Sequence, residues 1–159
     1  MRSLLFLVVF SAFFCEPYAA VKEHGVVIEG LTTKILNGAK NGAAYVKIQN
    51  NNSYAVTLYK VEVTPEVFDR VELHDHIERT DANGTKYMQM IEIPTMEIAA
   101  GETLSLFPGS RHLMLMDIKQ TYCGEKTLTF NFLFRKSSGE EFYVNLEVPV
   151  LKDSQRCGG

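Results

Sequence analysis

The sequence has 159 residues, with 16 Lys and Arg against 19 Asp and Glu, a formal net charge of −3 and 46% hydrophobic residues. A chain of this length forms one domain of about 150 residues, with or without a processed segment. The slightly negative charge is spread along the chain and excludes a nucleic-acid-binding surface. The content of aromatic and β-branched residues excludes a disordered chain.

Residues 1–20 predict a secretory signal peptide. A positive residue opens the segment, the uncharged apolar run 3–14 follows, and Ala19 and Ala20 are small residues suited to cleavage. The run is too short to span a bilayer, so we expect no integral membrane segment after signal removal. The mature chain 21–159 is then expected to be a single domain in the periplasm.

The mature chain shows almost no helical period. Short runs of alternating apolar and polar residues recur instead, separated by Gly, Asn, Asp, Ser and Pro, a pattern typical of strands joined by turns. These runs predict an all-β protein, an antiparallel sandwich or Greek-key barrel. The expected strands are 25–29, 33–36, 43–50, 55–63, 70–77, 86–93, 96–99, 103–107, 112–119, 127–135 and 141–150.

The cysteines suggest one disulfide. Cys15 lies in the signal peptide, and the bulky residues before it argue against lipidation, so Cys123 and Cys157 remain in a compartment where disulfides persist. The last two expected strands form a hairpin centred near Ser138, in which paired residues have an index sum of about 276. Cys123 then lies opposite Asp153, close to Cys157 in the tail. We expect a Cys123–Cys157 disulfide, with two free cysteines as the alternative.

Methionine and histidine gather in one part of the chain. The methionines of the mature chain are Met88, Met90, Met96, Met114 and Met116, and the histidines beside them are His74, His76 and His112. Alternate residues of a strand share a face, so three expected strands each present a His or Met pair on one side. Thioether and imidazole together suit the soft ion Cu(I), whereas zinc favours Cys or carboxylate. The pattern therefore predicts a Cu(I) site, with Met96 and Met116 assigned to the core.

The same residues carry a resemblance to a known family. The matching segments are Glu72-Leu73-His74, Met88-Gln89-Met90, Pro108-Gly109 and His112–Met116. They resemble the periplasmic copper chaperone family PCuAC, whose pattern has a His, a Met, 21 residues and then H-x-M. Here 21 residues separate Met90 from His112, and Met114 completes H-x-M. The resemblance covers nearly all of the mature chain.

The resemblance implies both a fold and a function. The fold is a cupredoxin-like β-sandwich, and the implied Cu(I) ligands are His74, Met90, His112 and Met114. The implied function is delivery of copper to the copper centre of a respiratory cytochrome oxidase, alongside a thioredoxin-like partner. The family pattern also has a Trp near the first strand, which is absent here, with Leu31 nearby.

One spacing departs from the family pattern. Fifteen residues separate His74 from Met90, more than the family usually has. The extra residues fit a longer hairpin tip around 81–84, which leaves the ligands at its base undisturbed. They also leave His76 as a rival to His74 for the role of first ligand.

Other functions remain open at this point. An electron-transfer cupredoxin needs a Cys thiolate beside His and Met, but no His or Met follows Cys123 at short spacing. A metal-free adhesion or interaction module explains the sandwich and the secretion, but not the grouping of Met and His. An enzyme is not expected, because the chain has no G-x-S-x-G elbow and no clearly placed catalytic acid.

Overall fold

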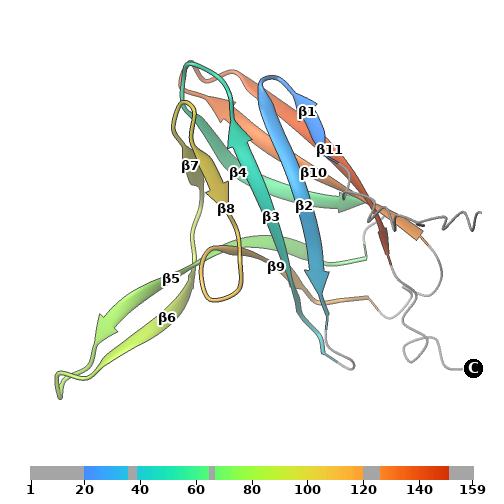
Figure 1. The fold of residues 1–159 in the computed structure, drawn as a ribbon. Helices are drawn as coiled ribbons and strands as arrows, with labels where there is room; N and C mark the ends of the chain where they lie inside the picture. The colour runs from blue at the N-terminus through green and yellow to red at the C-terminus, as the bar shows by residue number, and fades with distance from the viewer. Residues whose placement is uncertain (1–19, 36–38, 65–66, 120–125, 151–159) are drawn as a thin grey trace, which may run out of the picture.

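The computed structural model describes residues 20–35, 39–64, 67–119 and 126–150, and every regular element in these ranges is a strand. The strands form two antiparallel sheets that face each other (Figure 1), so the predicted β-sandwich is confirmed. Nowhere in these ranges is there a helix long and apolar enough to span a membrane. Most of the predicted signal peptide, together with Cys123 and Cys157, lies outside the described residues.

The larger sheet has seven strands. In spatial order it contains β1 (Val21–Glu23), β2 (Val26–Lys34), β3 (Gly42–Asn50), β9 (His112–Met116), β5 (Arg70–Thr80) and β6 (Lys86–Glu92), with β8 (Thr103–Ser105) also paired to β3. The smaller sheet contains β11 (Glu141–Val150), β10 (Lys126–Lys136), β4 (Val56–Thr64) and β7 (Met96–Ile98) in that order.

The hydrophobic core lies between the two sheets and follows the alternation of the strands. Phe130, Phe132 and Phe134 of β10 are fully buried, whereas Asn131 and Leu133 between them are partly exposed. Burying one large apolar side chain contributes about 1.5–3 kcal/mol. The buried aromatic residues of β10 therefore supply a large part of the free energy that holds the sheets together.

The observed strands follow the expected ones, with one pair of expected strands merged. Strands expected at 25–29 and 33–36 form one strand, β2, because a register shift after Glu29 absorbs extra residues while β2 stays paired to β3. Gly30, in this bulge, has a φ of +68°, which a residue without a Cβ adopts at low cost. The expected final hairpin is confirmed, since Arg135 pairs with Glu141.

The outer parts of β5 and β6 leave the sandwich as a two-stranded arm (Figure 1). β5 pairs with β9 from Arg70 to His74, and with β6 from His74 to Thr80. The additional residues between His74 and Met90 therefore lengthen a hairpin, as the sequence predicted. The Asp81 side chain closes the tip by accepting hydrogen bonds from the backbone N–H groups of residues 83 and 85 at 2.9 and 2.8 Å.

Asn50 connects the two sheets. It lies at the end of β3 with no exposed surface. Its Nδ2 donates to the carbonyl groups of Tyr54, Ile98 and Ala99 at 2.8, 3.0 and 3.0 Å, and its Oδ1 accepts from the backbone N–H of Asn52 at 3.0 Å. Because Ile98 belongs to β7, this side chain joins the larger sheet to an edge of the smaller one.

We expect Asn50→Ala to lower the free energy of unfolding by about 2–4 kcal/mol, because buried carbonyl groups lose their donor. Urea unfolding followed by circular dichroism measures this change. Asn145→Ala is the matched control, since Asn145 is exposed on β11, and a change below about 0.5 kcal/mol is expected there. Equal effects at the two positions would contradict the role assigned to Asn50.

Candidate metal centre

The pairing of β5 with β9 positions two histidines side by side. His74 lies opposite His112, and Leu73 lies opposite Leu113. The two leucines are buried in the core, at 4% and 0% exposure. Because successive side chains of a strand point to opposite faces, the two histidines lie on the outer face of the larger sheet.

The other His and Met residues predicted to share a face also lie here. We call this outer surface the histidine face; it comprises Tyr45 of β3, Glu72, His74 and His76 of β5, Met88 and Met90 of β6, and His112, Met114 and Met116 of β9. The His112 ring centroid lies 5.7 Å from that of His74 and 5.4 Å from that of His76. The shared face is confirmed, and the role of these residues as copper ligands stays a prediction.

One backbone carbonyl orients two of the three imidazoles. Nδ1 of His112 and Nδ1 of His76 lie 2.8 and 3.0 Å from the carbonyl oxygen of Ser110. A carbonyl oxygen only accepts, so both Nδ1 atoms carry the proton and donate. The Nε2 atom of each ring therefore carries a lone pair that can bind a metal ion.

A carboxylate orients the third imidazole. Nε2 of His74 donates to Glu72 Oε2 at 2.8 Å, and Arg70 Nε donates to Glu72 Oε1 at 2.7 Å. The hydrogen bond from His74, together with Arg70, lowers the pKa of Glu72, so this group is an ionised acceptor. In the neutral tautomer that donates through Nε2, the Nδ1 atom of His74 carries the lone pair.

That Nδ1 atom of His74 is also unusual in having no partner. Among the described residues, every other buried side-chain nitrogen or oxygen atom has a hydrogen-bond partner. Leaving such a group unpaired costs about 1–3 kcal/mol. A histidine that donates through one ring nitrogen to a carboxylate and leaves the other free has the arrangement typical of metal ligands.

The environment of His112 disfavours a positive charge on its ring. Burial lowers the pKa of His112, and the nearby imidazoles of His74 and His76 lower it further, while the Ser110 carbonyl partly opposes the shift. His112 is therefore an unprotonated imidazole at neutral pH, the state that metal binding requires.

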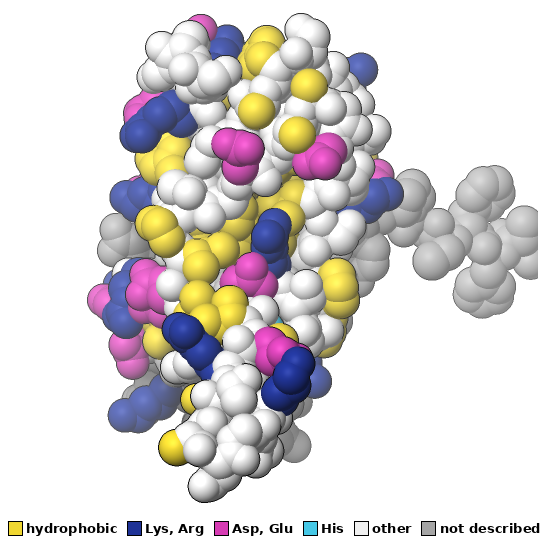
Figure 2. All heavy atoms as spheres, turned by 90° about the vertical axis from the view of Figure 1, so that its left-hand side faces the viewer, with side chains coloured by type: hydrophobic (Ala, Val, Ile, Leu, Met, Phe, Trp, Pro, Cys, Tyr) yellow, Lys and Arg dark blue, Asp and Glu magenta, His cyan; other side chains and the backbone are white. Residues whose placement is uncertain are grey.

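Figure 2 shows the side from which the arm projects, where histidine side chains are almost invisible, in keeping with the burial of His74 and His112.

Two thioethers lie near the imidazoles on the histidine face. In the part of the chain that the structure describes, no three His, Cys, Asp or Glu side chains are placed to hold an ion. Met114 is half-buried one diagonal step from His74, and Met90 is 47% exposed opposite His76.

The two methionines assigned to the core behave differently. Met96 of β7 is 2% exposed, which confirms the assignment. Met116 is half-buried on the histidine face, so its assignment to the core is wrong. The reason is the alternation of β9, in which Leu115 takes the inward position and directs Met116 outward.

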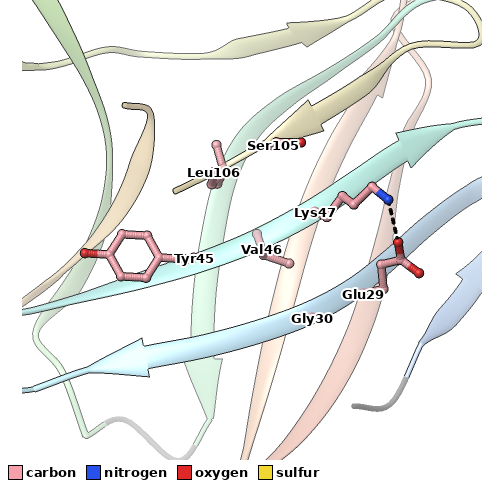
Figure 3. Close-up of a pocket in the computed structure, with 7 residues that line it drawn as sticks. All are labelled: Glu29, Gly30, Tyr45, Val46, Lys47, Ser105 and Leu106. Atoms are coloured by element: carbon pink, nitrogen blue, oxygen red, sulfur yellow. Dashed lines mark ion pairs between the residues drawn. The ribbon is translucent and has the colours of Figure 1, made fainter. Parts of the chain in front are cut away.

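A hollow on the larger sheet is separate from the imidazoles. It measures about 410 Å³ and is lined by residues of β2 and β3 and by Ser105 and Leu106 (Figure 3). Glu29 and Lys47 form an ion pair of 2.9 Å across it. Only Tyr45 belongs to both the hollow and the histidine face, and the hollow contains neither imidazole nor thioether.

Sequence reasoning missed two groups that orient the imidazoles. Glu72 was recognised only as part of a family segment, although its position two residues before His74 places both side chains on one face of a strand. Ser110 acts through its backbone carbonyl, and a carbonyl leaves no trace in the residue type. Only the turn that Pro108 and Gly109 predict indicated that the chain folds back there.

A family model and solved structures resemble this chain. The family described as "Putative lipoprotein LpqE-like" matches residues 19–150. Cys15 lies outside that match and outside the described residues, so the absence of lipidation stays a prediction. Among curated proteins, none matches the sequence.

The similar solved structures include PCuAC domains. The copper-bound PCuAC domain from PmoF2 is 16% identical with a TM-score of 0.54, covering 82% of this chain and 95% of that one. The apo PCuAC domain from PmoF1 is 18% identical with a TM-score of 0.55, covering 82% and 98%. Apo-DR1885 from Deinococcus radiodurans is 20% identical with a TM-score of 0.51, covering 98% and 97%. The chain therefore belongs to the LpqE-like family, a PCuAC-type family, and has the cupredoxin-like β-sandwich fold of PCuAC domains.

Proposed function

We propose that this protein is a periplasmic copper(I) chaperone. The observation that carries the proposal is the buried, unpartnered Nδ1 of His74 beside two imidazoles whose Nε2 atoms are left free. Thioethers on the same face add the soft donors that select Cu(I). A copper-bound domain of the same fold supports the choice of metal. The proposal assigns no catalytic reaction to the chain.

The proposed ligands are His74, Met90, His112 and Met114. Each of the four side chains is neutral when it binds, so the ion keeps its single positive charge whichever of them it contacts. Glu72 and the Ser110 carbonyl orient the two imidazoles, and outer-shell partners of this kind strengthen metal affinity by about 10–100-fold. Met90 is the exposed member of the set, so a donor from another protein can replace it.

We further propose that the chain delivers copper to the copper centre of a respiratory cytochrome oxidase, alongside a thioredoxin-like partner. The family resemblance and the exposure of Met90 support this step. An ion moves between two proteins most readily through an intermediate in which both contribute ligands. Such an intermediate needs a donor that the partner can approach, and Met90 meets this need.

The ligand assignment is tested by comparing His112→Ala with Met96→Leu. We expect His112→Ala to weaken Cu(I) binding by more than about 100-fold, since a direct ligand matters more than an outer-shell partner. Met96→Leu conserves volume in the core and is expected to leave the affinity unchanged. An anaerobic titration against a coloured Cu(I) chelator measures both.

Met114→Leu provides a second test that conserves side-chain volume, and it is expected to weaken binding in the same direction as His112→Ala. Equal affinities in all variants would remove the assignment. No competition by the unmodified protein would overturn the proposed function and favour a metal-free interaction module. A blue absorption band on adding Cu(II) would favour an electron-transfer cupredoxin instead.

Acid is expected to release the ion. An ordinary histidine gains a proton below pH about 6.5. Because burial lowers the pKa of His112, a proton competes with Cu(I) for this ring only at a still lower pH. We therefore expect the Cu(I) affinity to be constant above neutral pH. Below the pKa values, it should fall by about one log unit per pH unit for each imidazole ligand. The chelator titration repeated from pH 8 to about pH 4 checks this, and a flat profile contradicts imidazole ligation.

Delivery is tested by mixing the Cu(I)-loaded protein with the apo copper-centre domain of an oxidase. We expect copper to move to the acceptor, and Met90→Leu to slow the transfer more than Met96→Leu does. Separation of the two proteins followed by metal analysis measures the distribution. Transfer that is equally fast from free Cu(I) and from the loaded protein would contradict a role for direct contact.

A further inference from the structure

The arm carries a second group of soft side chains beyond the histidines of the sandwich. Met90 lies directly opposite His76, and Met88 lies opposite Glu78, one diagonal step from His76. Opposite Cβ atoms lie about 4.5–5.5 Å apart and diagonal neighbours about 7–8 Å apart, within reach of long side chains. One ion bound to His76 can therefore contact both thioethers. We call His76, Met88 and Met90 the outer set.

The register separates this set from Met114. Met114 lies opposite Glu72 on the other side of β5, so Met90 and Met114 are two strands and four residues apart. In a regular sheet with strands about 4.8 Å apart and about 3.3 Å per residue, their Cα atoms lie about 16 Å apart. Two side chains with three rotatable bonds each do not span that distance to one ion. We call His74, His112 and Met114 the inner set.

The outer set is accessible, whereas the inner imidazoles are buried. Met88 is 59% exposed and Met90 is 47% exposed, while His112 is 5% exposed. His76 is oriented by the same Ser110 carbonyl as His112, and their ring centroids lie 5.4 Å apart. The outer imidazole is therefore held next to an inner one.

We propose that His76, Met88 and Met90 form an outer Cu(I) position, from which the ion passes to the inner set and through which it leaves. The inference deepens the proposed copper function and rests on it. On the way in, the bonds from Cu(I) to the outer set break as bonds to the inner set form, and on the way out the same exchange runs in reverse. The ion stays Cu(I), and no proton is released because all donors are neutral. Met90 and Met114 thus act in succession.

The test follows the methyl groups of methionine by NMR during an anaerobic Cu(I) titration of the protein. We expect the first equivalent to shift the Met114 signal, and a second, weaker equivalent to shift the Met88 and Met90 signals together. The outer position is wrong if the Met90 and Met114 signals shift together with the first equivalent while the Met88 signal does not shift up to two equivalents. If no methionine signal moves, the proposed copper function itself fails.

Two variants with matched controls complete the test. His76→Ala and Met88→Leu are each expected to reduce the bound copper from two equivalents to one and to leave the tight equivalent intact. His24→Ala and Met116→Leu are the controls, because His24 lies on the β1–β2 turn and Met116 lies at the far end of β9. Met88 is exposed, so its variant keeps the fold. Loss of the tight equivalent in His76→Ala would make His76 an inner ligand and overturn the division.

Discussion

The register between β5 and β9 is the constraint on which the centre depends. Leu73 and Leu113 face each other in the core, and this pairing forces His74 and His112 to face each other outside it. A slip of one residue would exchange every inward side chain for an outward one. Burying one leucine contributes about 1.5–3 kcal/mol, so the core holds the register without any contribution from a metal ion. The imidazoles are adjacent because the leucines are buried.

The turn between β8 and β9 orients two of the imidazoles on the histidine face. β8 pairs with β3 at 47–49 and β9 pairs with β3 at 42–44, so both strands lie along the same edge of β3. The chain between them closes through a hydrogen bond from Phe107 N–H to the Arg111 carbonyl at 3.0 Å. This turn brings the Ser110 carbonyl to two imidazoles.

The same turn also links the arm to the sandwich. Arg111 Nε donates to Asp75 Oδ2 at 3.0 Å, and both side chains are partly exposed, so the pair contributes little to stability. Together with the hydrogen bond from His76 to Ser110, it restrains the base of the arm where β5 leaves β9. The outer part of the arm is held by the pairing of β5 with β6 and by an ion pair of 2.7 Å between Lys86 and Glu78. The position of Met88 and Met90 relative to the histidines therefore depends on contacts at the base.

Those parts of the structure that depend on local pattern were predictable from the sequence. Alternation in 112–116 predicted that His112 and Met114 share one face of a strand, and the turn residues located the hairpin tip at 81–84. Pairing between distant strands was not predictable, because no local signal says that β9 lies between β3 and β5. The bulge at Gly30 and the carbonyl of Ser110 were missed for a related reason, since both depend on backbone geometry rather than on residue type.

The arrangement of donors matches the opposing demands on a metal carrier. Buried imidazoles with preset orientation bind an ion firmly, because little order is lost on binding and water is excluded. In the proposed outer position the thioethers bind it more loosely, since Met88 and Met90 are exposed side chains with three rotatable bonds each. Placing the two kinds of donor on one face, with a shared carbonyl between His76 and His112, gives a path of increasing burial from the arm to the sheet.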